Sequence, residues 1–309
     1  MMKHAYLIIA HHEWRVLETL LTMLDDERND VYLHIDKRAG ELRKQVEHYS
    51  MKSAGLYVLP HPMKVRWGNF SLVEVEFRLF REALLHGPYR YYHLLSGVDL
   101  PIKSQDYIHA FFEQHRGKEF VGFFHGAVHE ADIRKKMAYF YILNDQKKQK
   151  DGWEHGVLSL FRNVFMGCQK ILWVRRPVRF DCKKGSNWVS ITQEFCEYLV
   201  RQCDADMVRR FRYTLCPDEL FLHTVIWNSP FRCRIYDMDD MQRGSMRKID
   251  WDRGNPYTWE EKDLAELLQS DLLFARKFSS RDLSVVNRIR EAVGGSLSEN
   301  LGAPIQLSC

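Results

Sequence analysis

The sequence has no long apolar run and no strong excess of charge. Its first apolar stretch, from Ala5 to Ala10, is far too short to cross a bilayer and too short for a secretory signal. We therefore expect a buried strand there and no integral membrane segment. The chain has 45 basic and 41 acidic residues, for a net charge of +4. A nucleic-acid-binding protein usually has a more concentrated basic stripe, so we expect no nucleic acid partner.

Paired cysteine motifs are also absent. The chain has 7 cysteines, and none of them forms a C-x-x-C pair, so we do not expect a zinc site. Scattered cysteines in a large chain without an export signal favour reduced thiols. We therefore expect a cytoplasmic protein, and we leave open a peripheral contact with the inner membrane.

The first third of the chain alternates expected strands with expected helices. This order predicts a mainly parallel α/β sheet with helices on both faces, in which ligands bind beyond the carboxyl ends of the strands. His11, Asp36, Pro60 and Gly97 follow those ends. The expected strands are Ala5–Ala10, Val31–Ile35, Leu56–Leu59 and Tyr91–Leu95, and the expected helices are Trp14–Leu24, Glu41–His48 and Phe70–Leu85.

The rest of the chain is less regular. Residues 134–180 are basic and aromatic without clear periodicity, so we expect an insertion or lid over a site. We expect one domain over residues 1–293 and a disordered small, polar tail over 294–309. The expected later strands are Trp188–Ile191, Arg234–Tyr236 and Met246–Trp251, and the expected later helices are Glu194–Arg201, Glu219–Trp227, Trp259–Leu268 and Leu283–Val293.

Four segments carry groupings suited to a functional site. Residues 215–223 read LCPDELFLH, which puts a proline and two carboxylates at the start of a helix, where each is favoured. Residues 94–103 read LLSGVDLPIK, a buried strand entering a sharp turn. Residues 185–188 read GSNW, and residues 273–278 read LFARKF. Taken singly, each segment also has a purely structural interpretation.

In combination, these segments resemble the core 2/I-branching β-1,6-N-acetylglucosaminyltransferase and peptide xylosyltransferase family (glycosyltransferase family 14). The likeness extends from about Tyr6 to Phe278, and we interpret the chain as a bacterial member. The resemblance implies a nucleotide-sugar-binding domain of the GT-A-like class. It also implies an inverting glycosyltransferase that needs no metal and no cofactor. Its partners would be a UDP-sugar donor and a glycan acceptor.

Such an enzyme must deprotonate an acceptor hydroxyl and stabilise a departing diphosphate. The resemblance makes Glu219 the catalytic base and Lys277 a phosphate-binding residue. Arg247 is the matching arginine partner, and Arg253 is its competitor because the spacing to Lys277 differs from that of the animal enzymes.

A metal motif is present only formally. Asp237 and Asp239 form an Asp-x-Asp pattern, which most enzymes of this fold use for metal binding. The pattern comes after a late strand rather than an early one, and so short a motif has a high false-positive rate. We therefore interpret these two residues as solvated loop carboxylates.

Other residues on the donor side have two interpretations each. His11 and His12 are adjacent at a strand end, so we expect their side chains to face opposite ways. One would pack in the core and the other would line the nucleotide pocket. Asp36 would accept from uracil or ribose, or simply end its strand. Asp99 would face the donor sugar or cap its turn.

On the acceptor side, Ser186 would permit close approach of a sugar. Trp188 would stack on the sugar or pack in the core. Asp218 would shape the helix start or hold a neighbouring group.

Two functions of different class follow from these observations. The first is transfer of a sugar from UDP-N-acetylglucosamine, with UDP-xylose as the alternative donor, to a growing bacterial surface polysaccharide. The second is a catalytically silent glycan-binding module that keeps the same fold.

Overall fold

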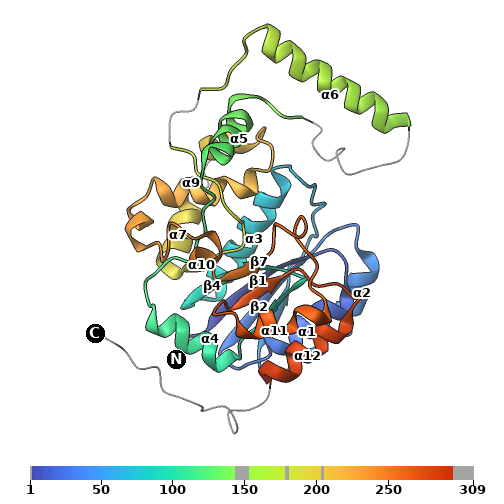
Figure 1. Ribbon diagram of the computed structural model, residues 1–309, viewed down its shortest axis with the longest axis vertical. Helices are drawn as coiled ribbons and strands as arrows, with labels where there is room; N and C mark the ends of the chain where they lie inside the picture. The colour runs from blue at the N-terminus through green and yellow to red at the C-terminus, as the bar shows by residue number, and fades with distance from the viewer. Residues whose placement is uncertain (1, 143–152, 178–180, 203–204, 295–309) are drawn as a thin grey trace.

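The computed structural model describes residues 2–142, 153–177, 181–202 and 205–294. Its centre is a five-stranded sheet in the order β3-β2-β1-β4-β6 (Figure 1). The first four strands run parallel, and β6 pairs antiparallel with β4 at one edge. The bounds are β1 His4–Ala10, β2 Asn29–Ile35, β3 Gly55–Val58, β4 Tyr91–Ser96 and β6 Ser190–Thr192.

Both faces of this sheet are buried under helices. Along β1, Leu7 packs in the hydrophobic cluster that contains α3, whereas Tyr6 and Ile8 pack in the cluster that contains α1 and α2. This division follows from the alternation of side chains along a strand. The flanking helices are α1 Trp14–Met23, α2 Gly40–Glu47 and α3 Ser71–His86. The expected mainly parallel α/β fold is therefore confirmed.

A small second sheet lies next to the carboxyl end of β4. Its strands are β5 Asp99–Pro101, β7 Arg247–Ile249 and β8 Phe274–Arg276, in the order β5-β8-β7. The register places Asp99 opposite Arg276. This pairing joins two of the segments that the sequence singled out, 94–103 and 273–278.

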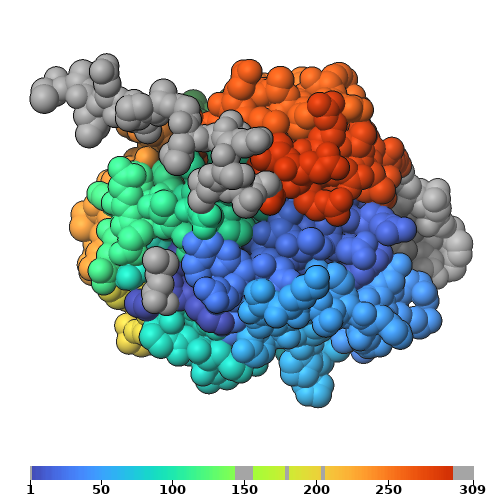
Figure 2. Space-filling model, turned by 90° about the horizontal axis from the view of Figure 1, so that it is seen from below, coloured from blue at the N-terminus to red at the C-terminus, as the bar shows by residue number. Residues whose placement is uncertain are grey.

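The remaining elements surround these sheets. The helix α12 packs on α1, so the C-terminal part of the described chain lies against the N-terminal part (Figure 2). The helices are α4 Gln105–Gln114, α5 Ala127–Ala138, α6 Trp153–Ile171, α7 Gln193–Gln202, α8 Ala205–Phe211, α9 Phe221–Trp227, α10 Met241–Ser245, α11 Leu264–Gln269 and α12 Leu283–Gly294, with 3₁₀ turns at Pro217–Glu219, Pro230–Arg234 and Glu261–Asp263.

Several local expectations were wrong. The expected strand 234–236 is the end of a 3₁₀ turn followed by a single bridge from Ile235 to Glu119. The expected helix 219–227 is a 3₁₀ turn and a separate α9, which meet at Leu220. The region 134–180, expected to be an insertion or lid, contains the end of α5 and the whole of α6, and that expectation stays a prediction. Of the expected tail 294–309, the residues after Gly294 lie outside the described part of the chain.

Two further expectations concern membrane segments and thiols. No helix among the described residues combines the length and the apolar character that crossing a bilayer requires. The cysteines within the described residues are free thiols: Cys168, Cys182, Cys196, Cys216 and Cys233.

A test of the fold concerns Gly122, which lies against the backbone of α10. A Cβ atom at this position would lie 2.0 Å from the carbonyl oxygen of Met241. We expect Gly122→Ala to lower the free energy of unfolding by about 1–3 kcal/mol, because overpacked backbone must shift. Gly167→Ala is the matched control, because a Cβ there meets nothing within 4 Å. In the helix α6 it should be neutral or stabilising by up to about 1 kcal/mol. Denaturant unfolding of both variants measures this, and equal effects would contradict the packing argument.

Candidate active site

Glu219 lies in an ion cluster with two lysines and a second carboxylate. Its Oε2 atom is 2.9 Å from Lys136 Nζ and 3.3 Å from Lys184 Nζ. The same two ammonium groups lie 3.1 and 2.8 Å from Asp132 Oδ2. The Glu219 side chain is 32% exposed and that of Lys136 is 8% exposed. The two lysines thus hold one carboxylate oxygen of Glu219, while the Glu219 side chain remains partly exposed at the surface.

The charge balance of the cluster keeps Lys136 protonated. Burial by itself would lower the pKa of the Lys136 ammonium, but Glu219 and its other anionic neighbours outweigh this effect and raise that pKa. A buried cation without these partners would be costly. The cluster therefore presents two fixed positive groups to Glu219.

The backbone around Gly185 holds Glu219 in place. The Gly185 N–H donates to the carbonyl oxygen of Glu219 at 3.0 Å. A Cβ atom on Gly185 would lie 1.9 Å from the carbonyl oxygen of Gly122 and 2.4 Å from His223 Nε2. Only a glycine fits at position 185, and its lack of a side chain lets the GSNW segment approach the 3₁₀ turn of Glu219 closely.

Asp218, next in the chain to Glu219, faces the interior. Burial, and then the charge of Glu219, raise the pKa of the Asp218 carboxyl. Burial, and then the charge of Asp218, also raise the pKa of Glu76, whose Oε1 accepts a hydrogen bond from Asn187 Nδ2 at 3.2 Å. Asp218 and Ser186 are both buried. Their positions favour a role in shaping the site, and their predicted contact with an acceptor stays a prediction.

Trp188 and Arg276 connect this region to the small sheet. The Arg276 guanidinium lies 4.4 Å from the centre of the Trp188 ring, and Trp188 is largely buried. The guanidinium also donates to Asp99 Oδ1 at 2.7 Å and to Ser96 Oγ. These contacts favour the core interpretation of Trp188, and its stacking on a sugar stays a prediction.

Asp99 closes the turn after β4. Its Oδ2 accepts from the Ser96 N–H at 2.8 Å, and its Oδ1 accepts from Ser96 Oγ at 2.6 Å. Together with the ion pair to Arg276, these bonds favour the turn-capping interpretation of Asp99. The sequence prediction missed Arg276, although this residue directly precedes Lys277 in the FARKF segment.

The two arginines proposed as partners of Lys277 occupy different environments. Arg247 is 1% exposed, and its guanidinium donates to Ser245 O, Val189 O and Ser190 Oγ. Contact with a diphosphate would require the core around it to open, so its position contradicts that role. Arg253 is nearer the surface and bonds three carboxylates: Asp250, Asp263 and Glu266.

Lys277 follows β8 at a fixed backbone position. Its N–H donates to Tyr257 O at 3.3 Å, and its carbonyl oxygen accepts from the Trp259 N–H at 3.0 Å. Two residues on, Ser279 Oγ donates to Glu13 Oε1 at 3.0 Å. Because Glu13 lines the pocket described next, the segment after Lys277 lies at the edge of that pocket.

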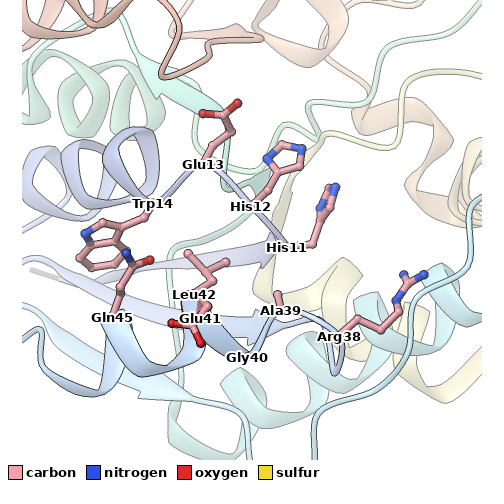
Figure 3. A pocket seen from close by; sticks show the side chains of 10 residues that line it. All are labelled: His11, His12, Glu13, Trp14, Arg38, Ala39, Gly40, Glu41, Leu42 and Gln45. Carbon is pink, nitrogen blue, oxygen red and sulfur yellow. The ribbon is translucent and has the colours of Figure 1, made fainter.

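A pocket of about 490 Å³ opens beyond the carboxyl ends of β1 and β2 (Figure 3). His11, His12, Glu13 and Arg38 line it. The expectation that the two histidines face opposite ways was wrong, since their ring centres are 4.0 Å apart. The strand ends at Ala10, so strand alternation does not extend to them.

The polar groups at this pocket have defined protonation states. Desolvation by surrounding atoms, and then the neighbouring His12, lower the pKa of His11 to about 4, which leaves a neutral ring at neutral pH. Asp36 accepts from the side chain and backbone of Arg38 and from the Val65 N–H. Burial opposes these bonds, but they lower the pKa of Asp36 to about 2. Asp36 is therefore ionised and paired with Arg38.

The Asp-x-Asp pattern has a local structural explanation. Asp237 Oδ1 accepts from the backbone N–H groups of Asp239 and Asp240, and its Oδ2 lies 3.3 Å from Arg243 Nε. Across the described ranges, no group of three or more His, Cys, Asp or Glu side chains is arranged to hold a metal ion.

Short stretches of chain connect the surroundings of Glu219 to those of the pocket. Gly185 contacts Glu219 and Trp188 contacts Arg276, and three residues of chain span at most about 11 Å. Arg276 lies three residues before Ser279, whose hydroxyl donates to Glu13 in the pocket wall. Arg247 lies inside the core.

Comparison with known proteins places this chain among relatives of known family. Xylosyltransferase 2 of Mus musculus is 27% identical over 299 residues, covering 89% of this chain and 32% of that protein. Xylosyltransferase 1 of Canis lupus familiaris is 26% identical, covering 89% of this chain and 29% of that protein. The chain thus spans about a third of the length of these relatives. The profile of the Core-2/I-Branching enzyme family matches residues 4–272. Because this match covers most of the sequence, the chain belongs to the Core-2/I-Branching enzyme family of glycosyltransferases.

Proposed function

We propose that this protein transfers a sugar from a UDP-sugar to a glycan hydroxyl by a single inverting displacement without a metal ion. The observation that carries the proposal is the geometry of Glu219. Two ammonium groups hold its Oε2, and the side chain is still 32% exposed. Within the described part of the chain, no hydrogen bond reaches Oε1. That oxygen is therefore available to an incoming hydroxyl.

In the proposed reaction, Glu219 removes the proton from the acceptor hydroxyl as its oxygen attacks the anomeric carbon of the donor. The new carbon–oxygen bond forms while the bond to the UDP oxygen breaks. The electron pair of the broken bond leaves with the diphosphate. Attack from the opposite face inverts the anomeric configuration, and no covalent enzyme intermediate is needed.

The leaving diphosphate needs positive charge or hydrogen-bond donors. Arg276 is suited to this because its planar guanidinium is fixed between Asp99 and Trp188, three residues before the Ser279 that bonds Glu13 of the pocket. We assign Arg276 and Lys277 as the cationic pair in place of Arg247. The pocket lined by His11 and Arg38, with Asp36 paired to Arg38 behind it, would then hold the nucleoside.

The donor sugar has two candidates. We favour N-acetylglucosamine, and the relatives named xylosyltransferases make xylose the alternative. As acceptor we propose a growing bacterial surface polysaccharide. The competing function, a silent glycan-binding module, does not explain why two lysines and Asp132 converge on a partly exposed Glu219.

The first test is Glu219→Gln, assayed with a panel of UDP-sugars. We expect turnover of one donor to fall by about 10²- to 10⁴-fold, the usual contribution of a general base. Binding of UDP should be unchanged, because Glu219 acts on the acceptor. Glu130→Gln, on the exposed face of α5, is the control and should keep full turnover. Undiminished function in Glu219→Gln would favour the silent module.

A second test asks whether Lys136 acts by holding Glu219 in place or only by adding positive charge to α5. Lys136→Met removes one of the two groups that hold Glu219, and Lys184 still bridges Glu219 and Asp132. We expect kcat to fall by up to about 100-fold with little change in UDP affinity, because the base loses its fixed orientation. Lys135→Met, the exposed neighbour on α5, should behave like the wild type. Equal losses in both variants would rule out a positioning role for Lys136.

A third test concerns the diphosphate. Arg276→Lys keeps the charge and loses the planar fork, so UDP affinity should fall roughly 10- to 100-fold, the value of a charged hydrogen bond or two. Arg253→Lys should leave UDP affinity unchanged. Turnover should resist EDTA in the wild type. Loss of turnover on chelation, restored by Mg²⁺, would contradict the metal-free reaction and would direct attention to Asp237 and Asp239.

A further inference from the structure

The helix α6 and the residues after it carry an unusual share of exposed apolar side chains. Of the 14 large apolar side chains that are exposed in the described part of the chain, 8 lie between residues 157 and 174. Phe161 is 55% exposed and Trp173 is 80% exposed. Isolated apolar residues on a surface are normal, but such a concentration marks a binding surface.

These side chains form one stripe. Val157, Leu160, Phe161 and Val164 follow the spacing i, i+3, i+4 and i+7, and Ile171 comes almost two turns after Val164. At about 100° per residue they share one face of the helix. We call this set, with Leu172, the apolar stripe of α6.

The opposite side of α6 holds the helix to the rest of the protein. Gln169 is buried, and its side chain donates to Phe140 O at 2.9 Å and accepts from Phe140 N at 2.8 Å. Just after the helix, the Arg176 N–H donates to Ala138 O at 2.9 Å. The apolar stripe consequently faces away from the body, and Figure 1 shows α6 standing apart from both sheets.

Apart from Glu154 in the first turn of α6, the charge of this region has one sign. From Gly156 to Pro177 the chain contains Arg162, Lys170, Arg175 and Arg176 and no acidic residue. These four charges equal the net charge of +4 of the whole chain, so the other residues sum to zero. Lys170 and Arg175 are exposed beside the stripe.

We propose that α6 docks the protein on an anionic phospholipid surface, with the apolar stripe inserted among the acyl chains. An apolar face of Leu, Phe and Trp flanked by basic residues is the pattern of a helix that lies in the plane of a membrane. Trp173 follows the helix, at the polar–apolar boundary that tryptophan prefers. The charged groups on its other face make α6 unsuitable as a membrane span.

A phospholipid surface fits better than a second copy of this chain. Pairing of two stripes would bring two basic segments together, and nothing acidic within Gly156–Pro177 would neutralise them. An anionic surface supplies both an apolar layer and the opposite charge. This inference does not rest on the proposed sugar transfer, because it concerns residues outside the site.

The test is flotation of the full-length protein with vesicles of equal parts phosphatidylglycerol and phosphatidylcholine. We expect binding to these vesicles, weaker binding to pure phosphatidylcholine, and partial release at high salt. The double variant Leu160→Glu/Phe161→Glu should bind at least about tenfold more weakly, because two large apolar side chains lose their burial. Leu85→Glu, on the exposed face of α3, is the control and should bind like the wild type.

Sedimentation velocity and tryptophan emission complete the experiment. A blue shift in emission with anionic vesicles that Trp173→Phe reduces would support the proposal without relying on the double variant. No binding to anionic vesicles by the wild type would overturn it. Equal vesicle binding by the double variant would also overturn it. So would a wild-type protein that sediments as a dimer and binds no vesicles, if the double variant sediments as a monomer.

Discussion

The sharing of two ammonium groups between Asp132 and Glu219 is the interaction on which the candidate active site depends. It joins α5, the GSNW segment and the 3₁₀ turn of Glu219, which are far apart in the sequence. Two positive and two negative groups balance each other, so the cluster can be partly buried without an uncompensated charge. Each lysine contacts both carboxylates, so removing either lysine leaves Asp132 and Glu219 with one shared cation.

The cations near the pocket, Arg276 and Arg38, are each paired with a carboxylate. Arg276 is paired with Asp99 and Arg38 is paired with Asp36, so these cations are already neutralised. Recognition of a diphosphate there would rest on the fixed direction of N–H donors rather than on excess charge. The strands provide that rigidity, because β4, β5 and β8 place Ser96, Asp99 and Arg276 in register.

Much of the fold was predictable because the early strands and helices have strong apolar patterns. The runs at β1, β2 and β4 are buried on both faces, and α1 and α3 show helical spacing. Two short strands of the small sheet, β5 and β8, were not predicted. The strand β8 has three residues, and it exists because β5 and β7 flank it.

The same distinction applies to the site. Glu219 and Lys277 could be selected because they lie in recognisable segments. Lys136 and Asp132 lie on α5, a helix without a strong apolar face, so no local pattern distinguishes them from solvated charges. Burial is a property of the folded chain, and it removed Arg247 from the candidates although its sequence position suited the role.

The two halves of the site have different structural origins. Residues at the ends of β1, β2 and β4 are positioned by the central sheet, whose strands are buried. Asp132 and Lys136 come instead from α5, which is attached to α6 and lies at the margin of the fold. During evolution, the surroundings of Glu219 could therefore diverge while the residues at the strand ends stayed under the constraint of the sheet.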